Sequence, residues 1–351
     1  MKIVFYSNRI KFSGDTLEKH GLGGSESALI NVSSTWKKLF PEDEIIVYNG
    51  NEKRSKDNYD GVIYKTMTDF FSEVKTMNAS AFISLREIFP FRLQFVDSKL
   101  KILWSQDDMN EGDLIKLKNE NYTTNNIDLF FVISNHSKND IQKSFPEKEI
   151  LLQRNGYRSD WIEEFKEKKP IAIYASTPFR GLDVLSICWK RIYDGCINRG
   201  VTPTLRVCTG MSLYQQPEDN FRDLYNYLKL LPGVEFVGAV CQKELYSIMK
   251  ECKVMTYSNH FLETGSMSVL EALANNLWVV TTDLGALGEQ VHDGVNGFLI
   301  KGDAHSPEYQ REFIEKSIDS LCEPLIPNSK GLIFSWEEQT KRMRNSILER
   351  I

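Results

Sequence analysis

Two glutamates eight residues apart carry the strongest chemical signal in this chain. Glu263 and Glu271 lie in VMTYSNHFLETGSMSVLEALANNLWVVTTDLG, residues 254–285, which has the pattern of a strand, a loop, a helix and a second strand. Glu271 is expected on the core-facing stripe of that helix with Met267 and Ala274, where a lone carboxylate is costly unless a donor binds it. A sugar hydroxyl is such a donor.

The start of the same helix offers a seat for an anion. The first backbone amides of a helix have no partner within it, and the helix dipole adds positive potential there. Here these amides belong to Gly265, Ser266, Met267 and Ser268. A nucleotide sugar presents an anion and vicinal hydroxyls together, so the stretch predicts a nucleotide-sugar site. The alternative is structural, with Glu263 as a favourable acid in a first helical turn and Glu271 as a partly exposed helix residue.

The stretch resembles the donor-binding signature of the retaining glycosyltransferases of family 4, which have the GT-B fold. That signature is a glutamate, seven residues, a second glutamate and then Ala-Leu-Ala, as found from Glu263 to Ala274. The next segment, DLGALGEQVHDGVNGFLI at residues 283–300, also looks like the family's. The resemblance implies that Glu263 is a catalytic residue that holds the hydroxyls of the donor sugar, and that Glu271 binds the ribose.

A basic turn lies upstream. TPFRGL, residues 177–182, resembles the turn that precedes the first helix of the family's second domain. By resemblance Arg180 is a donor-binding and catalytic residue, because a guanidinium forks onto paired phosphate oxygens and neutralises a leaving group. The family's second basic residue is replaced by Ala175, so either another residue supplies the charge or Ser176 and Thr177 donate hydrogen bonds instead. A solvated turn arginine is the alternative interpretation.

A glycine-rich loop, HGLGGSESAL at residues 20–29, precedes a helix predicted to run to about Phe40. A dinucleotide fingerprint would need glycine where Glu26 stands, and the loop begins well after the first strand. The loop resembles the Gly-Gly-x-Glu segment of the family, which implies that Gly23, Gly24 and Ser25 bind the donor. Glycine lets backbone amides approach phosphate closely. A flexible turn with Ser25 as helix cap is the alternative.

Three further contacts are expected at strand ends and loops. WSQDD, residues 104–108, follows a predicted strand, and ligands collect at strand ends in open α/β sheets. Relatives often have histidine where Gln106 stands, so the resemblance leaves Gln106 or Asp107 as a sugar or acceptor contact; a turn with capping aspartates is the alternative. The resemblance places backbone at Val240 beside the nucleotide base. The aromatic run at residues 89–95 predicts core packing or, alternatively, an acceptor or membrane contact.

Short apolar runs separated by helical or loop segments predict parallel sheets, and 351 residues suit two domains. We expect strands at residues 2–7, 44–48, 61–64, 81–85, 101–104, 129–133, 171–175, 205–209, 234–238, 254–257 and 277–281. The fold class predicted from this pattern and the resemblance is α/β, GT-B, with two Rossmann-like doubly wound domains facing across a cleft.

The predicted N-terminal domain, residues 1–165, takes the acceptor side, and residues 166–334 form the donor domain. A charged linker is expected at residues 163–170. The closing helix, residues 335–351, begins with a capping box formed by Ser335 and Glu338. By resemblance, this helix crosses back to the first domain.

Composition excludes several classes of protein. The net charge of −5 argues against a nucleic-acid partner. The six cysteines have no zinc spacing and predict buried, reduced thiols. The five histidines stand far apart in sequence, and no Asp-x-Asp occurs, so neither a metal site nor a cofactor is predicted. The N-terminal apolar run is too short for a signal peptide, so we expect a cytoplasmic protein with at most peripheral membrane contact.

The resemblance implies a hexosyltransferase that moves a sugar from a nucleotide diphosphate to an acceptor hydroxyl, with retention of configuration and without a metal. GDP-mannose is favoured as donor because mannosyltransferases are common among the relatives. The acceptor would be an unidentified glycan, lipid or protein. Two alternatives stay open: a nucleotide-sugar isomerase or epimerase with the GT-B fold, and a non-catalytic nucleotide-sugar binding protein, which Gln106 and Ala175 would favour.

Overall fold

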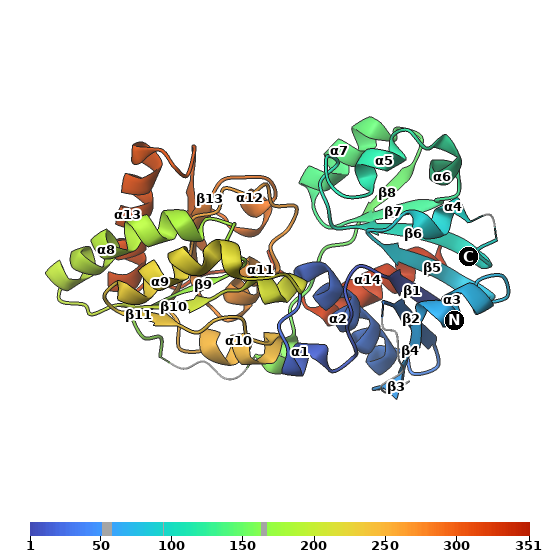
Figure 1. Ribbon diagram of the computed structural model, residues 1–351, viewed down its shortest axis with the longest axis horizontal. Helices are drawn as coiled ribbons and strands as arrows, with labels where there is room; N and C mark the ends of the chain where they lie inside the picture. Colours follow the sequence, from blue (N-terminus) through green and yellow to red (C-terminus); the bar gives the residue numbers. More distant parts are fainter. Residues whose placement is uncertain (51–57, 94, 163–166) are drawn as a thin grey trace. The chain divides into compact units, whose positions relative to one another are not determined.

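The computed structural model describes residues 1–50, 58–93, 95–162 and 167–351, and the chain divides into two units (Figure 1). Unit 1 comprises Met1–Leu17, Gly23–Gly156 and Phe334–Ile351, and unit 2 comprises Glu18–Leu22 and Tyr157–Ile333. Residues 163–166 of the predicted linker, including the predicted domain end at residue 165, lie outside the described residues.

Unit 1 is built on an eight-stranded sheet in the order β3-β4-β2-β1-β5-β6-β7-β8 (Figure 1). Its strands are β1 Lys2–Ser7, β2 Glu44–Asn49, β3 Asn58–Tyr59, β4 Val62–Thr66, β5 Ala79–Leu85, β6 Ser98–Ser105, β7 Leu129–Val132 and β8 Glu149–Leu152. Neighbouring strands are parallel except for β3 and β4. The central strands are apolar throughout because both faces of a parallel sheet are covered. The short strands β3 and β8 were not predicted.

The helices of the first half of the chain are α1 Thr16–Lys19, α2 Gly24–Leu39, α3 Met67–Glu73, α4 Phe89–Arg92, α5 Leu114–Leu117, α6 Asn121–Asn125 and α7 Asn135–Ser144. In α2 the predicted apolar stripe of Ala28, Leu29, Val32 and Trp36 is fully buried. The prediction that Ser25 caps this helix is wrong. The N-cap is Gly23, whose backbone is extended, so Ser25 already lies in the first helical turn.

The closing helix α14, Trp336–Leu348, starts with the predicted capping box of Ser335 and Glu338 and packs beside α2 (Figure 1). The buried Asp43 carboxylate joins the two helices. It accepts hydrogen bonds from Trp36 Nε1 at 2.9 Å, from Arg344 Nε at 3.0 Å and from the N-terminal amine. Burial alone would raise the pKa of Asp43, but these donors outweigh it and hold the pKa below its ordinary value.

Unit 2 is built on a six-stranded parallel sheet in the order β11-β10-β9-β12-β13-β14. Its strands are β9 Ile171–Ala175, β10 Thr204–Cys208, β11 Val234–Phe236, β12 Val254–Tyr257, β13 Trp278–Thr282 and β14 Gly297–Ile300. This is the 3-2-1-4-5-6 order of a doubly wound Rossmann sheet. The chain therefore reverses its direction of travel across the sheet between β9 and β12.

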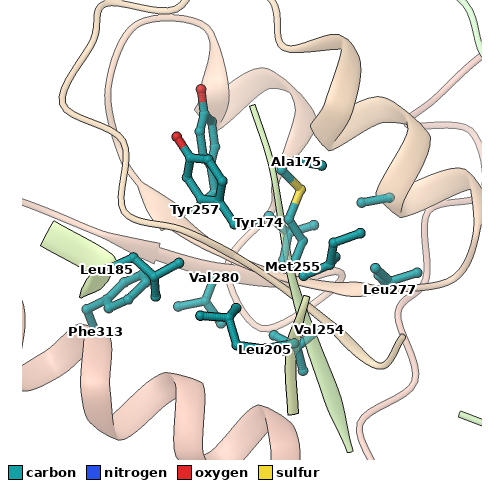
Figure 2. Close-up of a cluster of buried hydrophobic side chains, with 14 of the residues drawn as sticks. Tyr174, Ala175, Leu185, Leu205, Val254, Met255, Tyr257, Leu277, Val280 and Phe313 are labelled. Atoms are coloured by element: carbon teal, nitrogen blue, oxygen red, sulfur yellow. The ribbon is translucent and has the colours of Figure 1, made fainter. Parts of the chain in front are cut away.

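The helices that cover this sheet are η1 Ser159–Trp161, α8 Leu182–Asn198, η2 Met211–Tyr214, η3 Asp219–Phe221, α9 Arg222–Leu230, α10 Gln242–Met249, α11 Met267–Ala274, α12 Leu287–Gln290 and α13 Pro307–Cys322. Figure 2 shows how Leu185 of α8 and Phe313 of α13 meet the buried strand residue Val280. The two helices pack side by side over the sheet.

All six cysteines are free thiols, as predicted, and four of them are buried: Cys188, Cys196, Cys208 and Cys252. Burial raises the pKa of these four thiols to about 12. They are therefore protonated packing groups with low reactivity.

The aromatic run of residues 89–95 divides between core and surface. Phe91 is fully buried, which confirms core packing for this residue, whereas Phe89 and Phe95 are 36% and 43% exposed. Phe89 makes an edge contact with the exposed Phe71. None of the helices in the described part of the chain combines the length and the apolar character that crossing a bilayer requires.

The Asp43 cluster predicts an unequal effect of two charge substitutions in unit 1. Asp43→Asn keeps the shape of the side chain but leaves the N-terminal amine and Arg344 without a buried counter-charge, at a cost of about 3 kcal/mol. Arg350→Met breaks a more exposed pair with Glu149 and should cost about 1 kcal/mol or less. Melting temperatures measured in parallel test this, and equal losses would contradict it.

Candidate active site

The candidate site of unit 2 lies where β9 and β12 end, at the reversal point of the sheet, the place where ligands bind in open α/β sheets. Arg180 comes from the turn after β9, and Glu263 comes from the loop after β12. Arg180 Nη1 lies 2.6 Å from Glu263 Oε1, and the Glu263 side chain is only 3% exposed. The sheet order thus joins two of the predicted site residues that stand 83 positions apart.

Tyr174 of β9 and Tyr257 of β12 lie side by side (Figure 2) and support the segments that carry this ion pair. The Tyr257 hydroxyl donates to Glu263 Oε1 at 2.5 Å, and the Tyr174 hydroxyl donates to the carbonyl of Thr177 at 2.7 Å. The two rings are neighbours, with centroids 6.0 Å apart. Burial, reinforced by the Glu263 carboxylate, raises the pKa of Tyr257 well above its ordinary value, so the phenol remains a hydrogen-bond donor.

Arg180 lies against two aromatic rings and retains donor capacity. Its guanidinium carbon lies 4.5 Å from the ring centre of Phe261 and 5.5 Å from that of Phe179. Burial alone would lower the pKa of Arg180, but Glu263 and neighbouring phenols raise it, so the charge is permanent. Among the described residues, Arg180 Nε and Thr177 Oγ1 are buried and have no hydrogen-bond partner. Phosphate oxygens could accept hydrogen bonds from both of these donors.

The structure also defines the surroundings of Ala175, which stands where the family has its second basic residue. Ala175 is the last residue of β9 and is buried. Ser176 Oγ lies 3.4 Å from the Tyr257 hydroxyl, and its carbonyl accepts from Thr209 Oγ1 at 2.6 Å. Of the two hydroxyls considered as substitutes, that of Thr177 is therefore the one with an unused hydrogen bond.

Glu271 is buried on α11, as its position in the helix predicted, with 3% of the residue exposed. The predicted stripe was only partly right, because Met267 and Ala274 are half-buried while Val269 to Leu273 face the interior. Gln242 Nε2, at the start of α10, donates to Glu271 Oε1. Burial raises the pKa of Glu271 to about 8, although the Gln242 hydrogen bond opposes the shift. At neutral pH this side chain is mostly a neutral acid.

The start of α11 is capped by Ser266, whose hydroxyl accepts from the amide of Val269. The Ser266 amide donates to Gln290 Oε1 at 2.9 Å, and Gln290 Nε2 returns a hydrogen bond to the Ser266 carbonyl. One of the four amides predicted for an anion is therefore already used. Those of Met267 and Ser268 belong to the first turn and have no acceptor within the helix. Gln290 was not predicted, because only the folded chain brings it to this helix.

Glu263 is positioned through its backbone as well. Gly285 has a φ of +62°, and a Cβ there would stand 2.2 Å from the Glu263 carbonyl oxygen. The next amide, of Ala286, donates to that oxygen at 2.7 Å. Gly181 plays the same part beside Arg180, since a Cβ on it would meet the Ser258 carbonyl at 1.9 Å. Both charged residues thus depend on glycines where another chain segment approaches.

The remaining predicted donor residues occupy different parts of the chain. Gly23 is the N-cap of α2, and Gly24 and Ser25 are its first residues, all in unit 1. Val240 lies in unit 2, two residues before α10, where its carbonyl borders Gly21 of the Glu18–Leu22 segment.

In unit 1 the predicted acceptor contacts are engaged with neighbours. Gln106 exchanges hydrogen bonds of 3.3 and 3.4 Å with Asn155. Asp107 accepts from Arg86 Nε at 2.9 Å, and Arg9 lies 3.7 Å from it. Arg9 and Arg86, which follow the ends of β1 and β5, were not predicted; their signal was their place directly after two strands that are neighbours in the sheet.

Glu26 adds a buried acid to this group in unit 1. It is fully buried, and neither carboxylate oxygen has a hydrogen-bond partner within the described residues. Burial raises the pKa of Glu26, and the positive charge of Arg86 offsets only part of the shift. Unit 1 therefore holds a buried acid with a raised pKa within the glycine-rich segment at residues 20–29.

Comparison with known proteins gives this arrangement a family context. Residues 160–330 match the family model described as glycosyl transferases group 1. The chain is 25% identical over 248 residues to the uncharacterized glycosyltransferase MJ1178 of Methanocaldococcus jannaschii. That match covers 66% of this chain and 64% of the relative's length.

Solved structures similar to the whole chain include sucrose-phosphate synthase from Thermosynechococcus elongatus, with a TM-score of 0.70 at 14% identity, covering 99% of this chain and 98% of that one. Another is HepE from Anabaena in complex with UDP and glucose, with a TM-score of 0.69 at 14% identity, covering 99% and 100% of the two chains. The two Rossmann-like units are therefore those of the GT-B fold, as predicted, and residues 160–330 are similar to the glycosyl transferases group 1 model.

The protonation of Glu271 predicts a pH-dependent stability. Between pH 4.5 and about 8 the folded chain keeps a proton on Glu271 that the unfolded chain releases. Stability should therefore fall as the pH rises through this range, by up to about 1.4 kcal/mol per pH unit from this group. Glu271→Gln removes the titrating group. The melting temperature of this variant, relative to that of the unaltered protein, should therefore rise as the pH increases. The exposed Glu308→Gln is the control, and parallel curves for Glu271→Gln would contradict the assignment.

The backbone support of Glu263 predicts a difference between two glycine substitutions. Alanine at either Gly285 or Gly294 carries the cost of a left-handed backbone, about 1–2 kcal/mol. Only Gly285→Ala also collides with the Glu263 carbonyl, since Gly294 has no atom within 4 Å of the added Cβ. The melting temperature of Gly285→Ala should fall further than that of Gly294→Ala. Equal losses would show that the close approach is not a constraint.

Proposed function

We propose that this chain is a retaining glycosyltransferase of the family 4 type, which transfers a hexose from a nucleotide-diphosphate sugar to an acceptor hydroxyl without a catalytic metal. The observation that carries the proposal is the buried Arg180–Glu263 pair at the reversal point of a glycosyl transferases group 1 domain. HepE, a protein of similar fold, has been solved with UDP and with UDP-glucose. Such a donor has both the diphosphate and the hydroxyls that these residues suit.

The donor diphosphate is assigned to Arg180, Thr177 and the first turn of α11. Arg180 Nη1 is held by Glu263, but Arg180 Nε and Thr177 Oγ1 are buried and find no partner among the residues that the structure describes. The guanidinium can therefore bind phosphate along one edge while Glu263 fixes it from the other. The amides of Met267 and Ser268 add donors at the positive end of the helix. Gly23, Gly24 and Ser25 are assigned to the same donor from their resemblance to the family loop.

Glu263 is assigned to the hydroxyls of the donor sugar, and Glu271 to the ribose, with the base beside Val240. Glu263 Oε1 already accepts from Arg180 and Tyr257, so its charge is balanced before any sugar binds. Glu271 accepts a hydrogen bond from Gln242 and is mostly protonated at neutral pH, because its pKa is raised to about 8. A ribose hydroxyl would supply the donor that a buried carboxylate needs.

The chemical step places negative charge on the departing diphosphate as the anomeric bond breaks through an oxocarbenium-like state. Arg180, Thr177 and the helix amides are preorganised donors for that charge. The acceptor hydroxyl must then be oriented towards the anomeric carbon. Gln106 and Asp107 are proposed to bind the acceptor or the donor sugar. The sequence contains no Asp-x-Asp motif of the kind that would hold a metal on the diphosphate. The acceptor itself is a glycan, lipid or protein hydroxyl.

Donor binding is the first test of this function. Isothermal titration should detect one nucleotide family among UDP, GDP, UDP-glucose and GDP-mannose, the last being the donor favoured by the sequence. Arg180→Met should weaken binding about 10- to 100-fold, since a hydrogen bond to a charged group contributes about 1.5–3 kcal/mol. Glu271→Ala should also weaken it. Arg206→Met, which breaks ion pairs elsewhere in unit 2, should bind normally.

The same experiment separates the alternatives. If no nucleotide or nucleotide sugar binds, or if Arg206→Met loses as much affinity as Arg180→Met, the donor site is wrongly assigned. Once a donor is known, product analysis without added Mg²⁺ or Mn²⁺ tests the reaction. A transferase gives a retained glycoside with an acceptor. An epimerase alters the donor sugar without one, and a binding protein gives no turnover.

A further inference from the structure

Two histidines and an aspartate from three distant segments meet on the surface of unit 2. Asp183 lies in the first turn of α8, His260 in the loop after β12, and His305 in the loop between β14 and α13. His260 Nε2 is 3.1 Å from Asp183 Oδ1, and His305 Nε2 is 3.0 Å from Asp183 Oδ2. The two imidazole rings are neighbours, with centroids 4.8 Å apart. The fold thus gathers residues that stand 77 and 122 positions apart.

The spacing and the chemistry of these groups suit zinc. Tetrahedral ligands that lie about 2.0–2.1 Å from Zn²⁺ are separated from one another by about 3.3 Å. The nitrogen–oxygen distances in the cluster, 3.1 and 3.0 Å, differ from this value by only a few tenths of an ångström. Two imidazoles and a carboxylate are a donor set for a transition metal, whereas Mg²⁺ and Ca²⁺ prefer oxygen ligands.

Asp303 contacts His305 at Nδ1, the ring nitrogen that does not face Asp183. Its Oδ1 lies 3.5 Å from His305 Nδ1 and also accepts the backbone amide of His305 at 3.0 Å. Metal-binding histidines commonly direct their second ring nitrogen at a carboxylate, which fixes the tautomer and the ring orientation. Here that contact leaves His305 Nε2 facing Asp183.

The cluster is accessible to an ion. The side chains of His260, His305 and Asp183 are 32%, 51% and 44% exposed. A metal could therefore enter from solvent and keep water in its remaining position. A compact arrangement of donors at the surface requires no rearrangement of the core.

We propose that Asp183, His260 and His305 form a Zn²⁺ site, with Asp303 as the residue that positions His305. The site is separate from the proposed transfer chemistry and does not depend on it. Asp183 follows Arg180 by three residues and His260 precedes Glu263 by three, so a bound ion would link the two segments that carry the candidate donor residues. The proposed role of the bound ion is structural: it would hold the segments that contain Asp183 and His260 against the loop that precedes α13.

The test uses the full chain, stripped of metal with EDTA and returned to chelator-free buffer. Titration calorimetry with ZnCl₂ should show one ion bound per chain, and Mg²⁺ and Ca²⁺ should give no comparable binding. Zn²⁺ should also raise the melting temperature, because a ligand of the folded state stabilises it. His260→Ala and His305→Ala should each abolish these responses, and Asp303→Asn should weaken zinc affinity about 10- to 100-fold.

The control variants are His292→Ala, which lies outside the cluster, and His136→Ala. His136 belongs to a looser group, with its Nε2 3.9 Å from carboxylate oxygens of Asp108 and Asp140. Both variants should bind zinc normally. The absorption spectrum of bound Co²⁺ adds a readout that does not depend on stability. We expect no thiolate-to-cobalt band in it, because none of the proposed ligands is a cysteine.

Absence of zinc binding would overturn the proposal. So would binding that persists when both His260 and His305 are replaced, binding that is lost in His136→Ala, or a thiolate band that places the ion on cysteine. Circular dichroism of each variant distinguishes a lost site from a lost fold. A failure of donor binding would leave the zinc titration unchanged, so the two proposals fail separately.

Discussion

The buried ion pair between Arg180 and Glu263 is the interaction on which the candidate site depends. Either charge alone would be costly to bury, and the pair is tolerable only if its geometry is good and its remaining polar atoms find partners. The Tyr257 hydroxyl supplies one partner, and Gly285 lets the supporting backbone approach. Within the described part of the chain, Arg180 Nε is buried without a hydrogen-bond partner. Both hydrogen bonds described for Glu263 reach Oε1, and the Nε edge of Arg180 keeps an unused donor for a ligand.

Sheet topology brings this pair together. In a doubly wound sheet the crossovers after β9 and β12 leave in opposite directions. Here the loops at the two strand ends meet, since Ser258 Oγ donates to the Gly181 carbonyl at 2.7 Å and Arg180 pairs with Glu263. Unit 1 repeats the arrangement, with Arg9 after β1 and Arg86 after β5. Each unit therefore gathers charged side chains at its own reversal point, although Arg9 and Arg86 of unit 1 were not found from sequence.

Local patterns made most of the fold predictable. Apolar runs located eleven of the strands within a few residues, and the spacing of Glu271 placed a carboxylate in the interior. Contacts between distant segments could not be predicted in this way. The pairing of Glu271 with Gln242, and the approach of His260 to His305, depend on how helices and loops meet across the sheet. The histidines appeared unrelated because sequence distance was the only measure of their separation.

The charge balance of the site bears on how a diphosphate could be held. With Ala175 in place of a second cation, Arg180 is already paired with Glu263, and the protonation of Glu271 removes a negative charge that would otherwise repel the donor. If the chain has the proposed function, its affinity for the diphosphate would depend more on buried hydrogen-bond donors than on net positive charge. Such fixed dipoles act strongly where water is excluded. The unpartnered hydroxyl of Thr177 is then a functional replacement for a missing charge, and the loss of a basic residue is compatible with catalysis.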